Sequence, residues 1–444
     1  MKHDADTVRH YGATRVGNGD MVHVPVVRAG NWVFGTGLRA TRPDGRMDPA
    51  VLKAGRPLDM PPKAQREAEA IFGRIGTLLA QAGSAISLVA RVDQYYPDPR
   101  SVDPYHVARK RAMAGKVAPS TSILVGGLLN RDAAMDVQVL AATADSGRSV
   151  ERVQASLDAP QSSGYAPCVR VGDLVFVAGQ LARDDTGNIA REAKPPEGQL
   201  WNGTRIRLET GYLFHERLLP ALDAAGSSPD LVVKAQVYLS DPQALPGFLQ
   251  TWAEVFGDRI PPTTIVPVEH PGFGTLEATI EVNLVAVHAS ARSRLQDIRC
   301  DVELPMPGML PACSFDGLLF VAGLMAIDAE GLVPSAQVHA DAPYFHDTVQ
   351  AQMADILAKA KVIFAAAGTD LSQVVRALHF HDDLGGFLSA WAAWTREIGD
   401  KGLPFSAIGV SQNLFVPGAS LVVDLWGYVP DIRLTLRADS GQAG

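Results

Sequence analysis

The chain repeats itself three times, and this self-similarity limits its possible folds more than any other feature of the sequence. Three kinds of marker recur along the 444 residues: a glycine that ends an apolar strand, a glycine that follows a helix, and a proline before a small polar residue. The markers are Gly37, Gly179 and Gly323; Gly83, Gly226 and Gly368; and Pro119, Pro262 and Pro404. Within each set the spacing is 142 to 144 residues, which predicts three copies of one structural unit.

Each copy has the pattern of a mixed unit with the element order ββαβαββ. Apolar residues recur at helical spacing over Met353–Phe364, which predicts a long first helix in the third copy. In the second copy the pattern predicts a strand at Leu231–Leu239, a helix at Leu245–Phe256 and a closing strand at Thr279–Val287. In the third copy it predicts a closing strand at Ser420–Tyr428. We therefore expect an α+β fold in which each sheet packs against one layer of two helices.

The repeat spacing also predicts where the units begin and end. We expect a first unit at residues 1–150, a second at 151–296 and a third at 297–444, joined by polar linkers. Pro220 interrupts the first helix of the second unit, so we expect a kink there.

Charge and composition exclude several classes of protein. The 48 acidic residues outnumber the 40 basic ones, giving a net charge of −8, whereas nucleic-acid binding needs a concentrated basic surface. The sequence has no apolar stretch long enough to span a membrane and no secretory signal at its N-terminus, and its three cysteines form no disulfide framework. We expect a soluble, cytoplasmic protein that acts on a small molecule, without nucleic-acid or membrane partners.

Three segments of the second copy carry a resemblance to a known family. They are SGYAPCVRVGDLVFVAGQLARDDTG, LPALDAAGSSPDLVVKAQVYLSD and FLQTWAEVFGDRIPPTTIVPV. This copy resembles the Rid/YjgF family of enamine and imine deaminases, once labelled L-PSP endoribonucleases, and the other two copies match more loosely. The resemblance covers almost the whole chain. It implies a chorismate-mutase-like single-chain pseudo-trimer around a central β-barrel, with one ligand cleft at each unit boundary. Fusion removes the usual need to trimerise, and we expect a monomer or a weak homo-oligomer.

The resemblance also assigns roles to a few positions, and this chain departs from most of them. The family's arginine, which grips a substrate carboxylate, is replaced by Thr121, Thr264 and Ser406. Hydroxyls cannot make the charged bidentate contact of an arginine, so the resemblance implies a substrate other than a simple 2-imino acid. These hydroxyls either bind a neutral ligand or fill a lost site. The family's closing-strand glutamate is matched to Gln138, Asn283 and Asp424.

Asp424 is the only carboxylate among those three matches, and we interpret it as a candidate general base. Its apolar neighbours should raise its pKa, unless the side chain faces solvent. The family's N-terminal tyrosine corresponds to Tyr165, and to His23 in the first copy. Both could orient a substrate or donate a proton, or they could simply pack against the fold.

Other polar residues have weaker functional readings. His379 and His381 share a strand face and precede Asp382 and Asp383, but no third ligand follows at metal-binding spacing, so we expect no metal. Cys168 has no visible base to activate it and is expected to be a buried thiol. Glu269 and His270 are expected in a solvated loop. No nucleotide-binding fingerprint is found, and we expect no cofactor.

The preferred function is hydrolysis or deamination at the C–N bond of an imine, enamine or amide-like carbon. Asp424 would act with Tyr165 or His23, and the hydroxyls together with Gln138 and Asn283 would contact the substrate. The alternative is a non-catalytic binding or interaction protein whose three clefts have degenerated. A ribonuclease follows only from the family's old label, and the acidic charge disfavours it.

Overall fold

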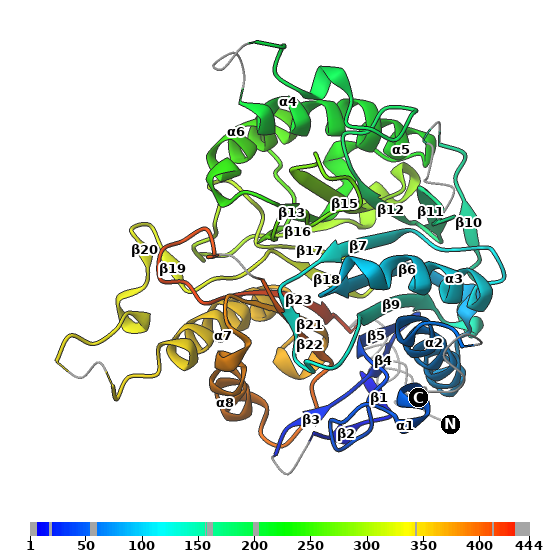
Figure 1. Cartoon of the computed structure of the whole chain (residues 1–444). Coiled ribbons are helices and arrows are strands. Elements are labelled where there is room, and N and C mark those ends of the chain that lie inside the picture. The colour runs from blue at the N-terminus through cyan, green and yellow to red at the C-terminus, as the bar shows by residue number, and fades with distance from the viewer. Residues whose placement is uncertain are drawn as a thin grey trace, which may run out of the picture.

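The structure is a computed structural model that describes residues 7–16, 20–53, 60–155, 157, 163–198, 204–341, 344–410 and 413–430. It has a mixed α+β fold in which three large sheets lie toward the middle and the long helices lie outside them (Figure 1). The N-terminal part, in blue and cyan, the middle part, in green, and the C-terminal part, in yellow to red, each contribute one sheet with its helices.

The three sheets share the order of their first six strands, and the third sheet has a seventh strand from the N-terminal part of the chain. The first orders β1 (Arg9–Tyr11), β4 (Val26–Ala29), β5 (Trp32–Leu38), β9 (Asp136–Ala142), β6 (Val89–Tyr96) and β7 (Ser120–Leu124). The second orders β10 (Val150–Arg152), β11 (Cys168–Val171), β12 (Leu174–Gln180), β15 (Ile280–Val287), β13 (Val232–Leu239) and β14 (Thr263–Pro267). The third orders β16 (Gln296–Ile298), β17 (Ala312–Phe315), β18 (Leu318–Val321), β23 (Leu421–Tyr428), β21 (Val374–His381), β22 (Phe405–Gly409) and β8 (Gly127–Leu128).

The helices agree with the sequence pattern. They are α2 (Lys63–Gln81), α3 (Val102–Ala112), α4 (Arg205–Tyr212), α5 (Leu219–Ala224), α6 (Leu245–Phe256), α7 (Thr348–Ala366) and α8 (Phe387–Ile398), with a short α1 (Pro49–Leu52). The kink predicted at Pro220 is a π-helical turn between α4 and α5, because proline cannot donate the hydrogen bond of a regular turn. Among the described residues, none of these helices has the length and apolar character that a bilayer crossing requires.

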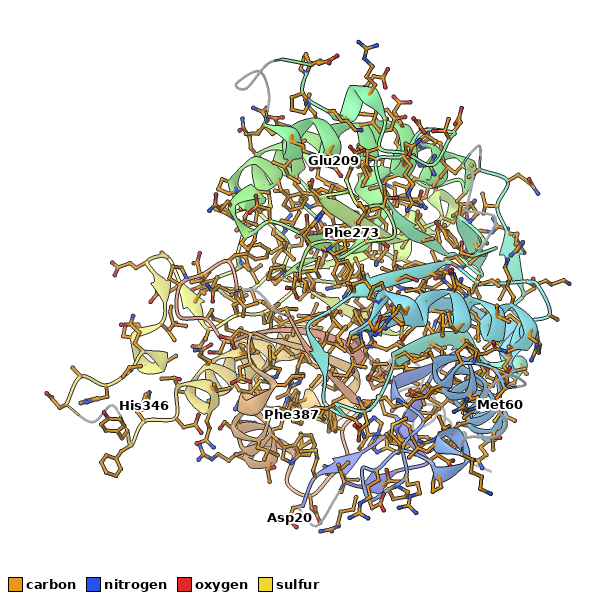
Figure 2. The ribbon with its side chains drawn as sticks, viewed as in Figure 1. Asp20, Met60, Glu209, Phe273, His346 and Phe387 are labelled. Atoms are coloured by element: carbon orange, nitrogen blue, oxygen red, sulfur yellow. The ribbon has the colours of Figure 1, made fainter. Side chains whose placement is uncertain are left out.

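One buried side chain of each first helix holds that helix to the closing strand of its sheet. Glu67 accepts a hydrogen bond from the backbone N–H of Ala134 at 2.8 Å, and Glu209 accepts one from Thr279 at 2.8 Å. Gln352 does the same for Ser420 at 2.7 Å. Figure 2 labels Glu209 within the middle part of the chain, among the side chains that fill the space between helix and sheet. Glu67, Glu209 and Gln352 lie 142 and 143 residues apart, which is the spacing of the glycine and proline markers in the sequence.

The three sheets meet one another in a ring of contacts. Isolated parallel bridges join Val117 to Tyr165, Ile260 to Met309 and Leu403 to His23, so the first sheet meets the second, the second meets the third and the third meets the first. Aromatic side chains from all three sheets share one core, including Trp32 against Phe176 and Phe320 against Trp426. The expectation of a central β-barrel is not met. The described strands form separate sheets that do not close into one, and the sheets are joined by side chains, single bridges and the short pairing of β8 with β22.

Candidate functional site

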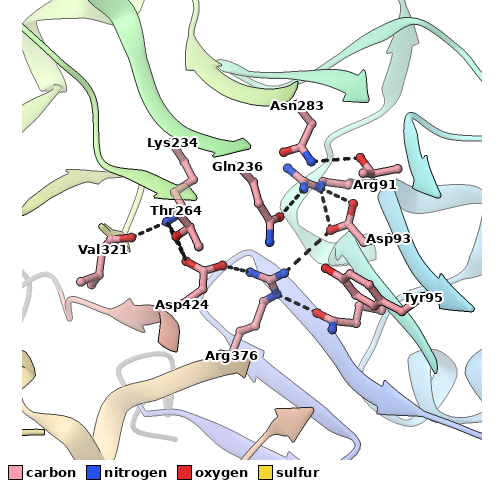
Figure 3. Close-up of polar contacts among 12 residues, drawn as sticks. Arg91, Asp93, Tyr95, Lys234, Gln236, Thr264, Asn283, Val321, Arg376 and Asp424 are labelled. Atoms are coloured by element: carbon pink, nitrogen blue, oxygen red, sulfur yellow. Dashed lines mark hydrogen bonds and ion pairs between the residues drawn. The ribbon is translucent and has the colours of Figure 1, made fainter. Parts of the chain in front are cut away.

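Asp424, the residue that the sequence favoured as a base, lies in a buried polar network between the sheets (Figure 3). Its Oδ1 lies 2.6 Å from Nζ of Lys234, and its Oδ2 lies 2.6 Å from a guanidinium nitrogen of Arg376. Thr264 donates its hydroxyl to Oδ1 at 3.1 Å. Each carboxylate oxygen of Asp424 therefore already has a cationic partner.

The prediction of a raised pKa for Asp424 is wrong. Burial alone would raise its pKa, but Lys234 and Arg376 outweigh burial and the net pKa is lowered. A carboxylate held between two cations is a poor proton acceptor. The sequence pattern missed this because Lys234 is 190 residues away along the chain.

Other residues expected in the clefts belong to the same network. Asn283 donates to the hydroxyl of Thr121 at 3.0 Å, and Arg376 donates to Oε1 of Gln138 at 2.9 Å. Arg91 donates to Asp93 and, at 3.2 Å, to Gln236. Arg91, Lys234 and Arg376 occupy one repeated position, 143 and 142 residues apart. Ser406 is also fully buried, and its hydroxyl has no hydrogen-bond partner among the described residues.

Tyr165 lies elsewhere, in a cavity of about 610 Å³ that we call cleft A. Its walls come from α3 and β7 of the first unit and from β12, β15 and the loop after β12 in the second. The residues used below are Tyr165, Arg183, Arg217, Glu281, Leu181 and Asp185. The cavity has the size of a small-molecule site.

Glu281 is the most unusual group in cleft A. Its side chain is almost buried, at 6% exposure, and its carboxyl group makes no hydrogen bond to any residue that the structure describes. Burial raises its pKa to about 8, although Arg183 opposes the shift. Gly179 makes room for this carboxyl group, because a Cβ at that position would collide with Oε1 of Glu281. Perturbed acids in cavities are typical of functional sites.

Two guanidinium groups share cleft A with Glu281. Arg183 donates to the Thr275 hydroxyl at 2.8 Å, and Arg217 contacts Oε1 of Gln180 at 3.3 Å. Arg217 lies in the π-helical turn, a form of helix frequent at functional sites. The resemblance matched the family's arginine to Thr121, and the cations of this cleft come from other positions.

Tyr165 completes the polar wall. Burial, and then the nearby Glu281, raise the pKa of Tyr165, so its phenol stays protonated at neutral pH. His106 faces the same cavity, and burial lowers its pKa to about 3, so its imidazole is neutral. Cleft A thus combines an acid with a raised pKa, a phenol donor, a neutral imidazole and two cations.

His23 lies in a second cavity of about 310 Å³, which we call cleft B. It is lined by residues that include His23, Arg39, Arg42, Arg46, Arg74, Arg131 and Asp132. Burial and then Arg39 lower the pKa of His23 to about 3, and its Nε2 lies 3.0 Å from the carbonyl oxygen of Thr36. Arg39 also pairs with buried Asp136 at 2.7 Å.

Asp136 and Glu281 occupy the same place in their units. In each sheet the closing strand pairs with the strand that ends at a marker glycine, and Asp136 and Glu281 lie two residues before Gln138 and Asn283. The third unit has Val422 at this place. Arg74, Arg217 and Lys359 likewise share one helix position, 143 and 142 residues apart. Lys359 donates to the carbonyl oxygen of Met325 at 2.9 Å.

Sequence reasoning therefore missed Glu281, Arg183 and Arg217. The repeat register contained a signal for two of them: Arg217 aligns with Arg74, and Glu281 aligns with Asp136. On a strand, residues two apart share a face, so Asn283 and Glu281 were equally acceptable matches. Contacts between distant segments of the chain distinguish these two candidates: Asn283 donates a hydrogen bond to Thr121 in the network, and Glu281 lines the cavity.

The remaining polar residues that the sequence singled out do not line cleft A or cleft B. Nε1 of Trp394 donates to Nε2 of His379 at 3.1 Å, and His381 is fully buried beside it. Within the described ranges, no three metal-ligating side chains gather. Cys168 is buried, and burial raises its pKa to about 12. Glu269 and His270 are exposed.

Comparisons with known proteins agree with the architecture of the second unit. A sequence model of the family described as Endoribonuclease L-PSP matches residues 156–288. A RutC family protein of Pyrococcus horikoshii is 32% identical over 113 residues, 25% of this chain and 79% of that protein. A RutC family protein of Pyrococcus abyssi is 32% identical over 111 residues, 25% of this chain and 78% of that protein.

Solved structures are also similar. A member of the YjgF/YER057c/UK114 family from Mycobacterium tuberculosis is 24% identical, with a TM-score of 0.24, and covers 31% of this chain and 99% of its own. A chorismatase is 10% identical, with a TM-score of 0.47, and covers 77% of this chain and 93% of its own.

Proposed function

The chain belongs to the Rid/YjgF family, which includes the L-PSP and RutC proteins, and from this premise we propose that it hydrolyses a C–N bond in a small imine, enamine or amide-like metabolite at cleft A. The observation that carries the proposal is the Glu281 carboxyl group, which is buried at the cavity wall with a pKa of about 8. Such a group carries a proton near neutral pH and can give it up and take it back during one turnover.

The reaction would proceed in three steps for an imine. Glu281 donates its proton to the imine nitrogen, which makes the carbon electrophilic. The Glu281 carboxylate then takes a proton from a water molecule while the water oxygen bonds to that carbon. Finally the carbinolamine transfers its hydroxyl proton to nitrogen and the C–N bond breaks, releasing an amine or ammonia and a carbonyl compound. Glu281 ends the cycle protonated.

Arg183 and Arg217 support an anionic substrate. A guanidinium group binds a carboxylate by paired charge-assisted hydrogen bonds. The missing arginines at Thr121, Thr264 and Ser406 do not exclude a 2-imino acid, because the cations of cleft A come from other positions. We therefore propose a substrate that carries a carboxylate next to its C–N bond. The phenol of Tyr165 would hold the water or the substrate nitrogen.

We further propose that the chain is a fusion of three family units, with boundaries near residues 150 and 296, that acts as a pseudo-trimer. The shared order of six strands in each sheet and the ring of bridges between the sheets support this. In such a molecule the three boundary clefts are free to differ, and cleft A is the one that keeps an acid without a cation bound to it.

The test is release of ammonia from freshly generated 2-imino acids, and then from neutral imines and lactams. We expect release by the wild type with a carboxylate-bearing substrate. Glu281→Gln should lower kcat by about 10²- to 10⁴-fold, the usual contribution of a general acid–base group. Asp185→Asn, at an exposed position of the same cleft, is the matched control and should be nearly neutral.

A binding role is the second candidate, and one observation favours it: two of the three equivalent acid positions no longer present a free carboxylate, since Asp136 is paired with Arg39 and the third position is Val422. Absence of release from every compound by a folded wild type, together with tight binding of the same compounds, would support binding over catalysis.

A further inference from the structure

Cleft B has a concentration of positive charge that its paired acids do not balance. Five arginines line it, namely Arg39, Arg42, Arg46, Arg74 and Arg131. Asp132 is the one carboxylate among the described lining residues. Arg39 is paired with Asp136 and Arg42 with Asp44, which leaves at least two positive charges in excess in a chain whose net charge is −8.

Arg74 is the arginine whose environment most needs a counter-ion. It is half-buried on α2, and it donates a long hydrogen bond of 3.4 Å to the carbonyl oxygen of Thr41. Burial and then the neighbouring Arg39 lower its pKa, which shows that the two cations disfavour each other's charge. Arg46 and Arg131 form no ion pair with a described residue.

The volume of cleft B limits the size of the ligand that it can bind. About 310 Å³ is at the small end of ligand-binding pockets, so a compact molecule fits and a folded domain or a nucleic-acid duplex does not. Several guanidinium groups around one cavity match the oxygens of phosphate or of closely spaced carboxylates.

We infer that cleft B is a binding site for a compact small molecule that carries two or more negative charges, on phosphate or carboxylate oxygens. The site holds this ligand without hydrolysing it, because the acid in the place of Glu281 is Asp136, and Arg39 occupies that carboxylate. Ligand binding at cleft B is independent of turnover at cleft A.

Isothermal titration calorimetry on the full chain tests the inference, with pyrophosphate, inorganic phosphate, citrate and acetate at one fixed ionic strength. We expect pyrophosphate or citrate to bind at one site per chain and more tightly than acetate. Preference between pyrophosphate and citrate then distinguishes a phosphorylated ligand from a polycarboxylate.

Variants locate the site. Arg74→Gln and Arg131→Gln should each weaken the bound polyanion at least about tenfold, because each removes a charged contact. Arg131 is exposed, so its variant keeps the test valid if Arg74→Gln does not fold. Arg100→Gln, at an exposed arginine outside the cavity, should leave affinity unchanged. Glu281→Gln should also leave it unchanged, which separates this inference from the proposed function.

Two results would overturn the inference. One is that no polyanion binds more tightly than acetate. The other is that a polyanion binds the Arg74→Gln and Arg131→Gln proteins as tightly as it binds Arg100→Gln, which would place the site elsewhere.

Discussion

Cleft A and cleft B are built at equivalent places and have opposite electrostatic character. In cleft A the closing-strand acid is Glu281, which makes no hydrogen bond to a described residue, and Leu181 follows the bulge of the neighbouring strand. In cleft B the acid is Asp136, and the residue equivalent to Leu181 is Arg39, which binds it at 2.7 Å. Burial raises the pKa of both acids, so the arginine, rather than burial, makes the difference. One substitution can therefore turn a reactive acid into half of an ion pair.

The largest expected effect is on the stability of cleft B. Asp136→Asn leaves Arg39 buried without its counter-ion and should lower the free energy of unfolding by about 3–5 kcal/mol. Glu281→Gln breaks no ion pair and should not lower it. Urea unfolding followed by circular dichroism measures both. Equal losses in the two variants would mean that the two acids are not in different environments.

The second prediction tests whether an arginine like Arg39, introduced into cleft A, changes the behaviour of Glu281. Leu181→Arg should place a cation beside Glu281, lower the pKa of that acid and reduce kcat about 10²-fold. The assay is ammonia release, and Leu181→Met is the control for the change of side chain without a change of charge. Full activity of the arginine variant would show that pairing does not silence the acid.

The third prediction concerns pH. The folded-state pKa of Glu281, about 8, is above its ordinary value, so its contribution to stability is present at low pH and is lost as pH rises from about 4.5 to about 8. Glu281→Gln should therefore gain stability relative to wild type across that window, by roughly 1.4 kcal/mol for each pH unit and several kcal/mol in all. Melting temperatures at several pH values measure this, and a constant difference would contradict the raised pKa.

The smallest expected effect comes from comparing Tyr165 in cleft A with His23, its equivalent in cleft B. Tyr165→Phe removes the phenol of cleft A and should lower kcat about five- to tenfold, the effect of one lost hydrogen bond. His23→Phe changes the equivalent place in cleft B and should leave ammonia release unchanged. A loss of activity in the His23 variant alone would move the reaction to cleft B.

Local patterns in the sequence predicted much of the fold. The helix at Leu245–Phe256 has the predicted ends, and the closing strands begin within one residue of the predicted positions. These elements depend on apolar periodicity, which neighbouring residues reveal. The expected central barrel is not seen, because closure of sheets into a barrel depends on contacts between distant parts of the chain and not on local periodicity.

The site was harder to predict for a similar reason. Tyr165 does line a cleft with an acid, as its position suggested, but the acid is Glu281 and not Asp424. Both carboxylates lie on buried strands among apolar neighbours. Asp424 forms an ion pair with Lys234, which is far away in the sequence, and Glu281 forms no ion pair with a described residue. Local sequence patterns do not reveal such a difference.

The polar network at the centre also determines which units can stand beside each other. Lys234 of the second unit finds its counter-ion in Asp424 of the third, at the place that Asn283 holds in the second unit itself. A copy of the second unit in the third position would offer Lys234 an amide in place of a carboxylate and leave a buried ammonium unneutralised. The Lys234–Asp424 pair therefore favours contact between these two different segments of the chain over contact between two copies of the second one.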